Sequence, residues 1–162
     1  LHEESGEAAA LELLLAAAES HPDQTAVQIA VANAYLDGDD PKRAQPYLER
    51  VLNTPRRSLD DDAFARRQLL ALRIEDFDDR YDVAAKNAQS PDPARRAATA
   101  VFMREVIATD PLYWQPHMML GLAVRASDGD VAALGHLNDA VRLRPNDPSL
   151  RSILATLLKQ MG

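Results

Sequence analysis

The chain has 162 residues, of which 46% are hydrophobic but only 5% aromatic, and it carries a formal net charge of −7. The acidic balance argues against nucleic acid as a partner, because phosphate binding needs a basic face, and against adsorption to an anionic membrane surface. The absence of cysteine excludes disulfides, thiolate nucleophiles and cysteine-ligated zinc, and no apolar run approaches the ~20 residues of a membrane-spanning helix.

Apolar periodicity and capping residues predict an all-α chain of antiparallel helix pairs. In chain order, helices are expected at 3–19, 24–37, 41–53, 61–76 or beyond, 93–109, 112–127, 131–143 and 148–160. Four pairs combine a good N-cap with a proline suited to the first helical turn: Asp40-Pro41, Asp92-Pro93, Asp110-Pro111 and Asp147-Pro148. Gly38 and Gly129 each follow an apolar run, where a left-handed C-terminal cap is expected.

Small and apolar residues recur with one spacing in segments 25–58 and 114–147. The second segment contains Leu120, Gly121, Ala123, Ala133, Leu137, Ala140 and Pro145. The first contains Val31, Ala32, Ala34, Tyr35, Ala44, Leu48 and Val51, with Pro55 one place early. This pattern resembles the tetratricopeptide repeat (TPR), whose period is about 34 residues. The alternative is a generic alanine-rich helical bundle, which does not require prolines and small residues at that period.

The resemblance implies a right-handed α-solenoid in a single domain spanning 1–162. Its expected parts are a half repeat at 3–22, repeats at 25–58 and 114–147, an irregular extended repeat at 59–111 and a capping helix at 148–161. The residues expected where helices cross closely are Ala32, Ala44, Gly121 and Ala133. The polar outer face expected of the capping helix consists of Ser149, Arg151, Ser152 and Lys159.

The middle of the chain departs from the period, because 56 positions separate Pro55 from Pro111. The second helix of this repeat keeps its register through Thr99, Met103 and Val106. The core stripe expected for the first helix is displaced and consists of Leu70, Ala71, Ile74 and Phe77. The excess at 76–92 either extends the first helix or forms an extra short one. It is either a functional decoration or a solvated excursion with an acidic face.

No motif in the sequence predicts catalysis. The four histidines, which are His2, His21, His117 and His136, form no H-E-x-x-H pair. The Asp-rich stretches 37–40 and 60–62 lack the ligand spacing of an EF-hand. We expect His117 to be packed in the core and His136 to lie at the surface. We expect no enzyme activity, no bound metal and no cofactor.

In TPR proteins the first helices of successive repeats line a concave groove that binds a peptide. Carried over by position, the resemblance places this groove at Ile29, Asn33, Leu36, Gln115, Met118, Leu122 and Arg125. Chaperone-adaptor members of the family also grip a C-terminal carboxylate with basic and amide side chains. Of those positions only Asn33 is retained here, so no carboxylate clamp is expected.

The resemblance therefore implies a non-catalytic adaptor, scaffold or assembly factor that holds a protein or peptide segment. Two alternatives stay open: a docking or regulatory region of a larger enzyme or membrane-anchored assembly protein, and a self-associating homo-oligomer. The preference for arginine over lysine indicates a bacterial source, in which envelope assembly, secretion, pilus or cytochrome biogenesis are typical settings. Because the sequence opens with Leu1, we expect a fragment or processed form, soluble in either the cytoplasm or the periplasm.

Overall fold

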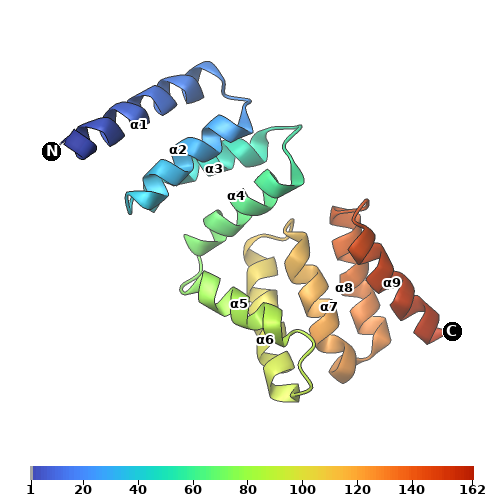
Figure 1. Ribbon diagram of the computed structural model, residues 1–162. Coiled ribbons are helices and arrows are strands. Elements are labelled where there is room, and N and C mark those ends of the chain that lie inside the picture. The colour runs from blue at the N-terminus through green and yellow to red at the C-terminus, as the bar shows by residue number, and fades with distance from the viewer. Residues whose placement is uncertain (1) are drawn as a thin grey trace. The chain divides into compact units, whose positions relative to one another are not determined.

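The computed structural model describes residues 2–162, with side chains from Ala8 onward. Over this range the chain forms helices and no strands, so the all-α prediction is confirmed (Figure 1). The helices are α1 (His2–Ser20), α2 (Thr25–Asp37), α3 (Pro41–Asn53), α4 (Leu59–Ala71), α5 (Phe77–Asn87), α6 (Pro93–Thr109), α7 (Trp114–Asp128), α8 (Asp130–Leu143) and α9 (Pro148–Met161). Within the described range, none is both long and apolar enough to cross a membrane. Residue 1 of the predicted domain lies outside the described residues.

The predicted helices correspond closely to the observed ones except in the middle of the chain. There the segment expected from 61 onward is divided into α4 and α5, so the excess residues form an extra helix. The helices are separated at Asp76, whose backbone is left-handed with φ 52°. Aspartate tolerates this conformation better than most residues, and it ends helical continuity. The expected core stripe is consequently not a feature of one helix: Leu70 lies on α4, Ile74 in the loop and Phe77 on α5.

Three of the four Asp-Pro pairs begin helices as predicted. The carboxylates of Asp40, Asp92 and Asp147 accept hydrogen bonds from backbone N–H groups in the first turns of α3, α6 and α9. These bonds satisfy donors that a helix leaves unpaired at its start. The prediction for Asp110 is wrong in detail, because its carboxylate accepts from the N–H of Leu112 at 3.1 Å inside a turn. Helix α7 begins later, at Trp114.

Four prolines mark the same kind of turn between helices. Pro22, Pro55, Pro111 and Pro145 each occupy the second position of a four-residue turn, where the fixed φ of proline is favoured. The closing N–H to carbonyl bonds are Gln24 to His21 at 3.2 Å, Arg57 to Thr54 at 3.4 Å, Tyr113 to Asp110 at 3.3 Å and Asp147 to Arg144 at 3.3 Å. The recurrence of one local structure at these four sites follows the spacing that the sequence displays.

After three of these turns, the fourth residue of the helix that follows contacts a backbone carbonyl near the turn through its side chain. Gln28 Nε2 donates to the Ala18 carbonyl at 3.1 Å and to the His21 carbonyl at 3.4 Å. His117 Nε2 lies 3.0 Å from the Pro111 carbonyl. Arg151 Nε donates to the Pro145 carbonyl at 2.7 Å. Chemically different side chains at the same helical position therefore contact carbonyl groups in the preceding turn or, for Ala18, in the last turn of the preceding helix.

The two glycines expected at left-handed helix ends behave differently. Gly38 has φ −82°, and the left-handed residue of that loop is Asp39 with φ 55°, so the prediction for Gly38 is wrong. Gly129 has φ 88° and ψ 173°, a region that is essentially restricted to glycine. As the single residue between α7 and α8, Gly129 sets the reversal of the chain at this hairpin.

Replacing Gly129 by alanine is expected to lower the free energy of unfolding by about 1–3 kcal/mol, because a Cβ strains this backbone conformation. Gly135 is the matched control, since it lies exposed within α8 and nothing surrounds the position of a Cβ. Gly135→Ala should instead stabilise by about 0.5–1 kcal/mol through helix propensity. Urea unfolding followed by Trp114 fluorescence measures both. Equal effects of the two substitutions would contradict the strain at Gly129.

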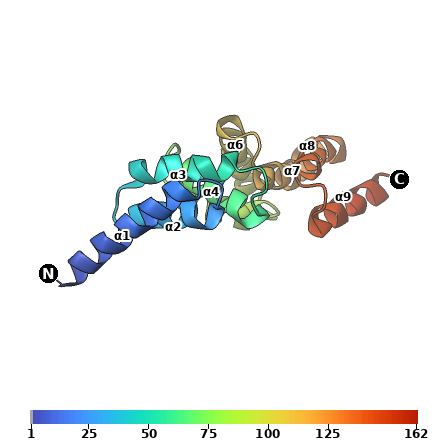
Figure 2. The same ribbon diagram turned by 90° about the horizontal axis from the view of Figure 1, so that it is seen from above.

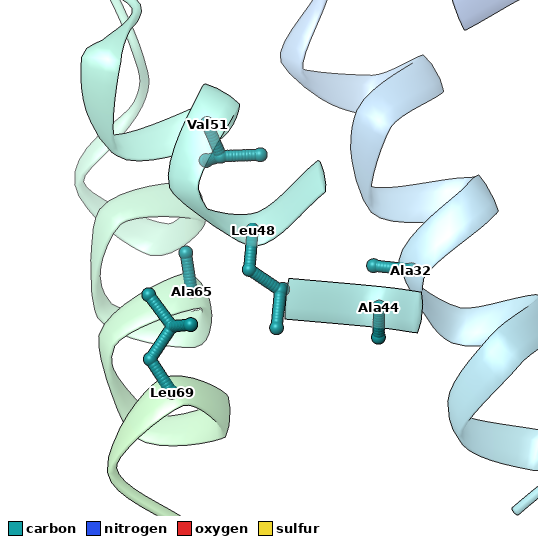
Figure 3. Close-up of a cluster of buried hydrophobic side chains, with 6 residues drawn as sticks. All are labelled: Ala32, Ala44, Leu48, Val51, Ala65 and Leu69. Atoms are coloured by element: carbon teal, nitrogen blue, oxygen red, sulfur yellow. The ribbon is translucent and has the colours of Figure 1, made fainter. Parts of the chain in front are cut away.

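The chain divides into two compact units, Leu1–Arg73 and Ile74–Gly162, called unit 1 and unit 2. The core of unit 1 is shared by α2, α3 and α4. Its buried side chains are Ala32, Ala44, Leu48, Val51, Ala65 and Leu69 (Figure 3). Ala44 lies beside Ala32, and Leu48 lies toward Leu69, so the small residues mark the crossing of α2 and α3 as predicted.

In unit 2 helices α7 and α8 cross closely at Gly121. A Cβ on Gly121 would lie 3.1 Å from both the Ala133 carbonyl oxygen and Leu137 Cγ, which confirms the expected need for a small residue. Ala133, Leu137 and Leu157 form a buried cluster that joins α8 to α9. The residues expected on the outer face of α9, which are Ser149, Arg151, Ser152 and Lys159, are all exposed.

Candidate functional site

The extra helix α5 forms a hairpin with α6 in unit 2. The Thr99 hydroxyl donates to the Ala84 carbonyl at 3.5 Å, and both residues are buried, so the two helices cross closely. The Phe77 ring lies 5.3 Å from Tyr81 and 6.1 Å from Phe102, measured between centroids. Tilted aromatic pairs at these separations add to the energy of burial. Aromatic packing thus holds α5 against α6.

A groove of about 500 Å³ runs along this hairpin. Helix α5 contributes Arg80, Val83, Ala84 and Asn87 to its lining. Helix α6 contributes Arg95, Ala98, Thr99, Val101 and Phe102. Most of these positions follow an i, i+3, i+4, i+7 spacing, which places them on one face of each helix. The groove is therefore formed by two neighbouring helical stripes.

The floor of the groove is buried and its walls are exposed. Ala84, Thr99 and Phe102 form the floor. Val83 and Val101 form apolar walls and are 57% and 66% exposed. A single exposed valine is common on protein surfaces, but two that face one groove form a contiguous apolar patch. Such a patch with polar groups at its margins is typical of a binding surface.

Arg80 lies at one end of the groove. Its guanidinium carbon is 4.2 Å from the centroid of the Phe102 ring, which is a cation–π contact. The guanidinium also donates to both carboxylate oxygens of Glu105 and to the Glu75 carbonyl at 3.3 Å. These contacts hold the Arg80 side chain in one orientation above the apolar floor.

Arg95 and Asn87 lie at the other end, because α5 and α6 are antiparallel. Arg95 Nε is 3.5 Å from Asp92 Oδ2, and the two side chains are 65% and 48% exposed. An exposed ion pair of this kind contributes little, about 0–1 kcal/mol. The charged side chains that line the groove are both arginines, although the chain as a whole is acidic.

A second cavity, of about 540 Å³, lies between α1 and α2 in unit 1. Its described lining is mainly alanine and leucine, with Asp37 as the charged group. The first turns of α1 project beyond α2, and Leu13 on α1 is 74% exposed (Figure 2). Among the described lining residues of this cavity, polar groups do not converge from two sides, so the α5–α6 groove is the better candidate site.

Three of the predicted groove residues lie on α2 in unit 1. Asn33 is exposed on this helix. Ile29 and Leu36 are half-buried and pack against the core of α2, α3 and α4. Their side chains therefore already contribute to the stability of unit 1, and a bound peptide would contact only their outer edges.

The other four predicted residues lie on α7 in unit 2, and all are half-buried. Met118 packs against the cluster that joins α8 to α9. Arg125 Nε donates to Asp130 at 2.8 Å, and its Nη2 donates to the amide oxygen of Gln160 on α9. Gln115 and Leu122 lie on the same helix as these two. A partner-binding role for this set remains a prediction.

His117 on α7 and His136 on α8 differ in their surroundings. His117 is buried, as predicted, and its Nδ1 lies 4.0 Å from Asp139 Oδ2. His136 is half-buried rather than at the surface, and burial together with Arg104 lowers its pKa. Among the described residues, no group of three or more histidine, aspartate and glutamate side chains is placed to hold a metal ion.

No protein-family model matches the chain, and no curated protein sequence matches it.

Sequence reasoning indicated 76–92 as a place of interest but did not identify the groove. The residues it missed are Arg80, Val83, Asn87, Arg95, Ala98, Val101 and Phe102. One signal was present in the sequence: α5 and α6 each contain a valine, Val83 and Val101, in addition to the apolar residues of their buried faces. Such extra apolar residues indicate a second apolar surface only when it is known which face of each helix is buried.

Proposed function

We propose that this protein is a non-catalytic interaction module, built from TPR-like helix pairs, that holds a segment of another protein. The pairs α2–α3, α5–α6 and α7–α8 correspond to three repeats, and α1 and α9 correspond to a half repeat and a cap. The recurring proline turns and the fastening bonds from Gln28, His117 and Arg151 support this assignment. In this assignment α4 corresponds to the first helix of a repeat that has no second helix of its own.

The observation that carries the proposal is the groove on the α5–α6 hairpin. Its two exposed valines leave apolar area in contact with water, and burying that area against a partner is favourable by roughly 25 cal/mol per Å². Its charged side chains, Arg80 and Arg95, lie at the two ends, where they orient a ligand. The dimensions suit a short helical or extended segment.

Selection of peptides from a random display library on the intact chain tests the proposal. We expect groove-dependent binders whose affinity falls at least about tenfold in the double variant Val83→Gln/Val101→Gln, because glutamine removes the apolar walls while keeping helix propensity. Val131→Gln is the matched control, since Val131 is 76% exposed on α8 outside the groove. Its affinity should be unchanged.

If the selected peptides bind the double valine variant with unchanged affinity, and the variant keeps its helicity, the peptides bind elsewhere. That result would overturn the groove as the site. Loss of binding in Asn33→Ala instead would favour the surface that the sequence predicts on α2, because Asn33 is exposed and its truncation removes no core contact. Failure to obtain any peptide that binds with micromolar affinity would remove the proposed function itself.

A further inference from the structure

We infer that the segment held in the α5–α6 groove is an acidic amphipathic helix that carries two carboxylates about seven residues apart. This inference rests on the proposed function and concerns the chemistry of the partner. Two features of the groove carry it: the shape of its apolar floor and the placement of its two guanidinium groups.

The shape of the groove matches a helix rather than an isolated side chain. Its lining spans Arg80 to Asn87 on α5 and Arg95 to Phe102 on α6, which is two turns or about 10 Å on each helix. Two antiparallel helices that line the groove with small residues, Ala84 and Ala98, leave a furrow in which a third helix can lie. A partner helix with carboxylates at i and i+7 offers the residues at i+3 and i+4 to Val83 and Val101, because these positions share one helical face.

The charge of the groove determines which helix fits. Arg80 lies level with Phe102, and Arg95 lies seven residues before Phe102 on the antiparallel helix. The two guanidinium-bearing residues are therefore about 10 Å apart along the groove, and residues i and i+7 of a helix are separated by the same rise. Carboxylates at those positions would meet both arginines, whereas lysines there would be repelled.

The carboxylates that already pair with Arg80 and Arg95 do not prevent either arginine from binding a carboxylate of the partner helix. Arg80 and Glu105 are 40% and 44% exposed, and Arg95 and Asp92 are more exposed still. Exposed pairs are weak, and a guanidinium has five donors, so each arginine can share its donors with a second carboxylate. When a bound helix excludes water from the groove, the incoming pairs gain strength because the local dielectric falls.

The probe is a fluorescein-labelled, alanine-rich helical peptide with glutamates at two positions seven residues apart and leucines at the third and fourth positions between them. A second peptide carries lysine in place of both glutamates. In fluorescence anisotropy with the intact chain at low salt, we expect the glutamate peptide to bind at least about tenfold more tightly. The preference should shrink in 0.5 M NaCl, since exposed charges are screened within about 3–5 Å there.

The second part of the test uses variants of the protein in which arginine is replaced by glutamate. Arg95→Glu should remove the preference for the glutamate peptide, and Arg80→Glu/Arg95→Glu should invert it. Because Arg80 also pairs with Glu105, the Arg95 variant alone keeps the test valid if the double variant folds poorly. Arg142→Glu is the matched control: Arg142 pairs with Asp139 at i+3 spacing, as Arg95 does with Asp92, but lies on α8. It should leave the preference unchanged.

Equal binding of the two peptides, or a preference that survives Arg95→Glu, would overturn the inference. If neither peptide binds while display-selected peptides still depend on Val83 and Val101, the acidic-helix inference fails and the proposed function stands.

One further outcome is specific to this chain, because Glu12 and Glu19 on α1 are also seven residues apart and exposed. Sedimentation showing an oligomer that Glu12→Gln/Glu19→Gln dissociates would make a second copy the occupant and overturn the inference of a separate partner.

Discussion

Gln28→Glu is expected to cost unit 1 about 3–4 kcal/mol of unfolding free energy at pH 7, because that is the cost of keeping a carboxyl group protonated ~2.7 pH units above its ordinary pKa. Gln28 is fully buried, and its amide nitrogen donates to the carbonyls of Ala18 and His21. An ionised carboxylate cannot donate to these oxygens, and its burial without a cation costs more than its protonation.

The loss of stability caused by Gln28→Glu should grow as the pH rises. A carboxyl group that must be neutral in the folded state has a pKa raised above the unfolded value of about 4.3. The folded state then binds more protons than the unfolded state, so the variant loses stability as pH rises above that value. Urea unfolding followed by circular dichroism at pH 4 and pH 7 should show the difference from the native chain growing with pH.

Gln24→Glu is the matched control, since Gln24 is exposed and lies immediately before α2. Its effect should stay within about 0.5 kcal/mol at both pH values, as for most exposed substitutions. A cost below 1 kcal/mol for Gln28→Glu, or one that does not change with pH, would mean that Gln28 is not what fastens α2 to the end of α1.

The second large effect is expected at Phe77, the first residue of α5. Phe77→Ala should lower the free energy of unfolding of unit 2 by about 3–5 kcal/mol, the usual range for a buried phenylalanine. Phe77 is 2% exposed and contacts the rings of both Tyr81 and Phe102. Trp114, the single tryptophan of the chain, lies in unit 2, so its fluorescence during urea unfolding reports the change.

Val83→Ala is the control on the same helix, because Val83 is 57% exposed and should lose less than about 0.5 kcal/mol. The two variants also distinguish an effect on stability from an effect on binding. Val83→Ala should lower the affinity of peptides that bind in the groove without changing the midpoint of urea unfolding. If Phe77→Ala unfolds like the native chain, α5 would be a solvated excursion, as one interpretation of the sequence allowed, rather than a wall of the groove.

The candidate site shows how far sequence reasoning reaches here. The segment 76–92 stood out because it breaks the period, which is a property of spacing alone. The roles of Arg80, Val83 and Val101 were not visible, because each residue type is ordinary on a helix surface. Conversely, Arg125 and Met118 were chosen by position in a repeat, and only the packing of α8 and α9 shows that both already have contacts within unit 2.

Most of the helices and several of their joints could be predicted from the sequence. Asp92 and Asp147 cap helices, Pro22 and Pro111 occupy turns, and Gly121 permits a close crossing, because each effect depends on a residue and its near neighbours. The tertiary structure alone decided that α4 and α5 are separate helices and that Val83 and Val101 remain exposed. Exposure depends on which helices pack on which faces, and that is settled by contacts between residues far apart in the chain.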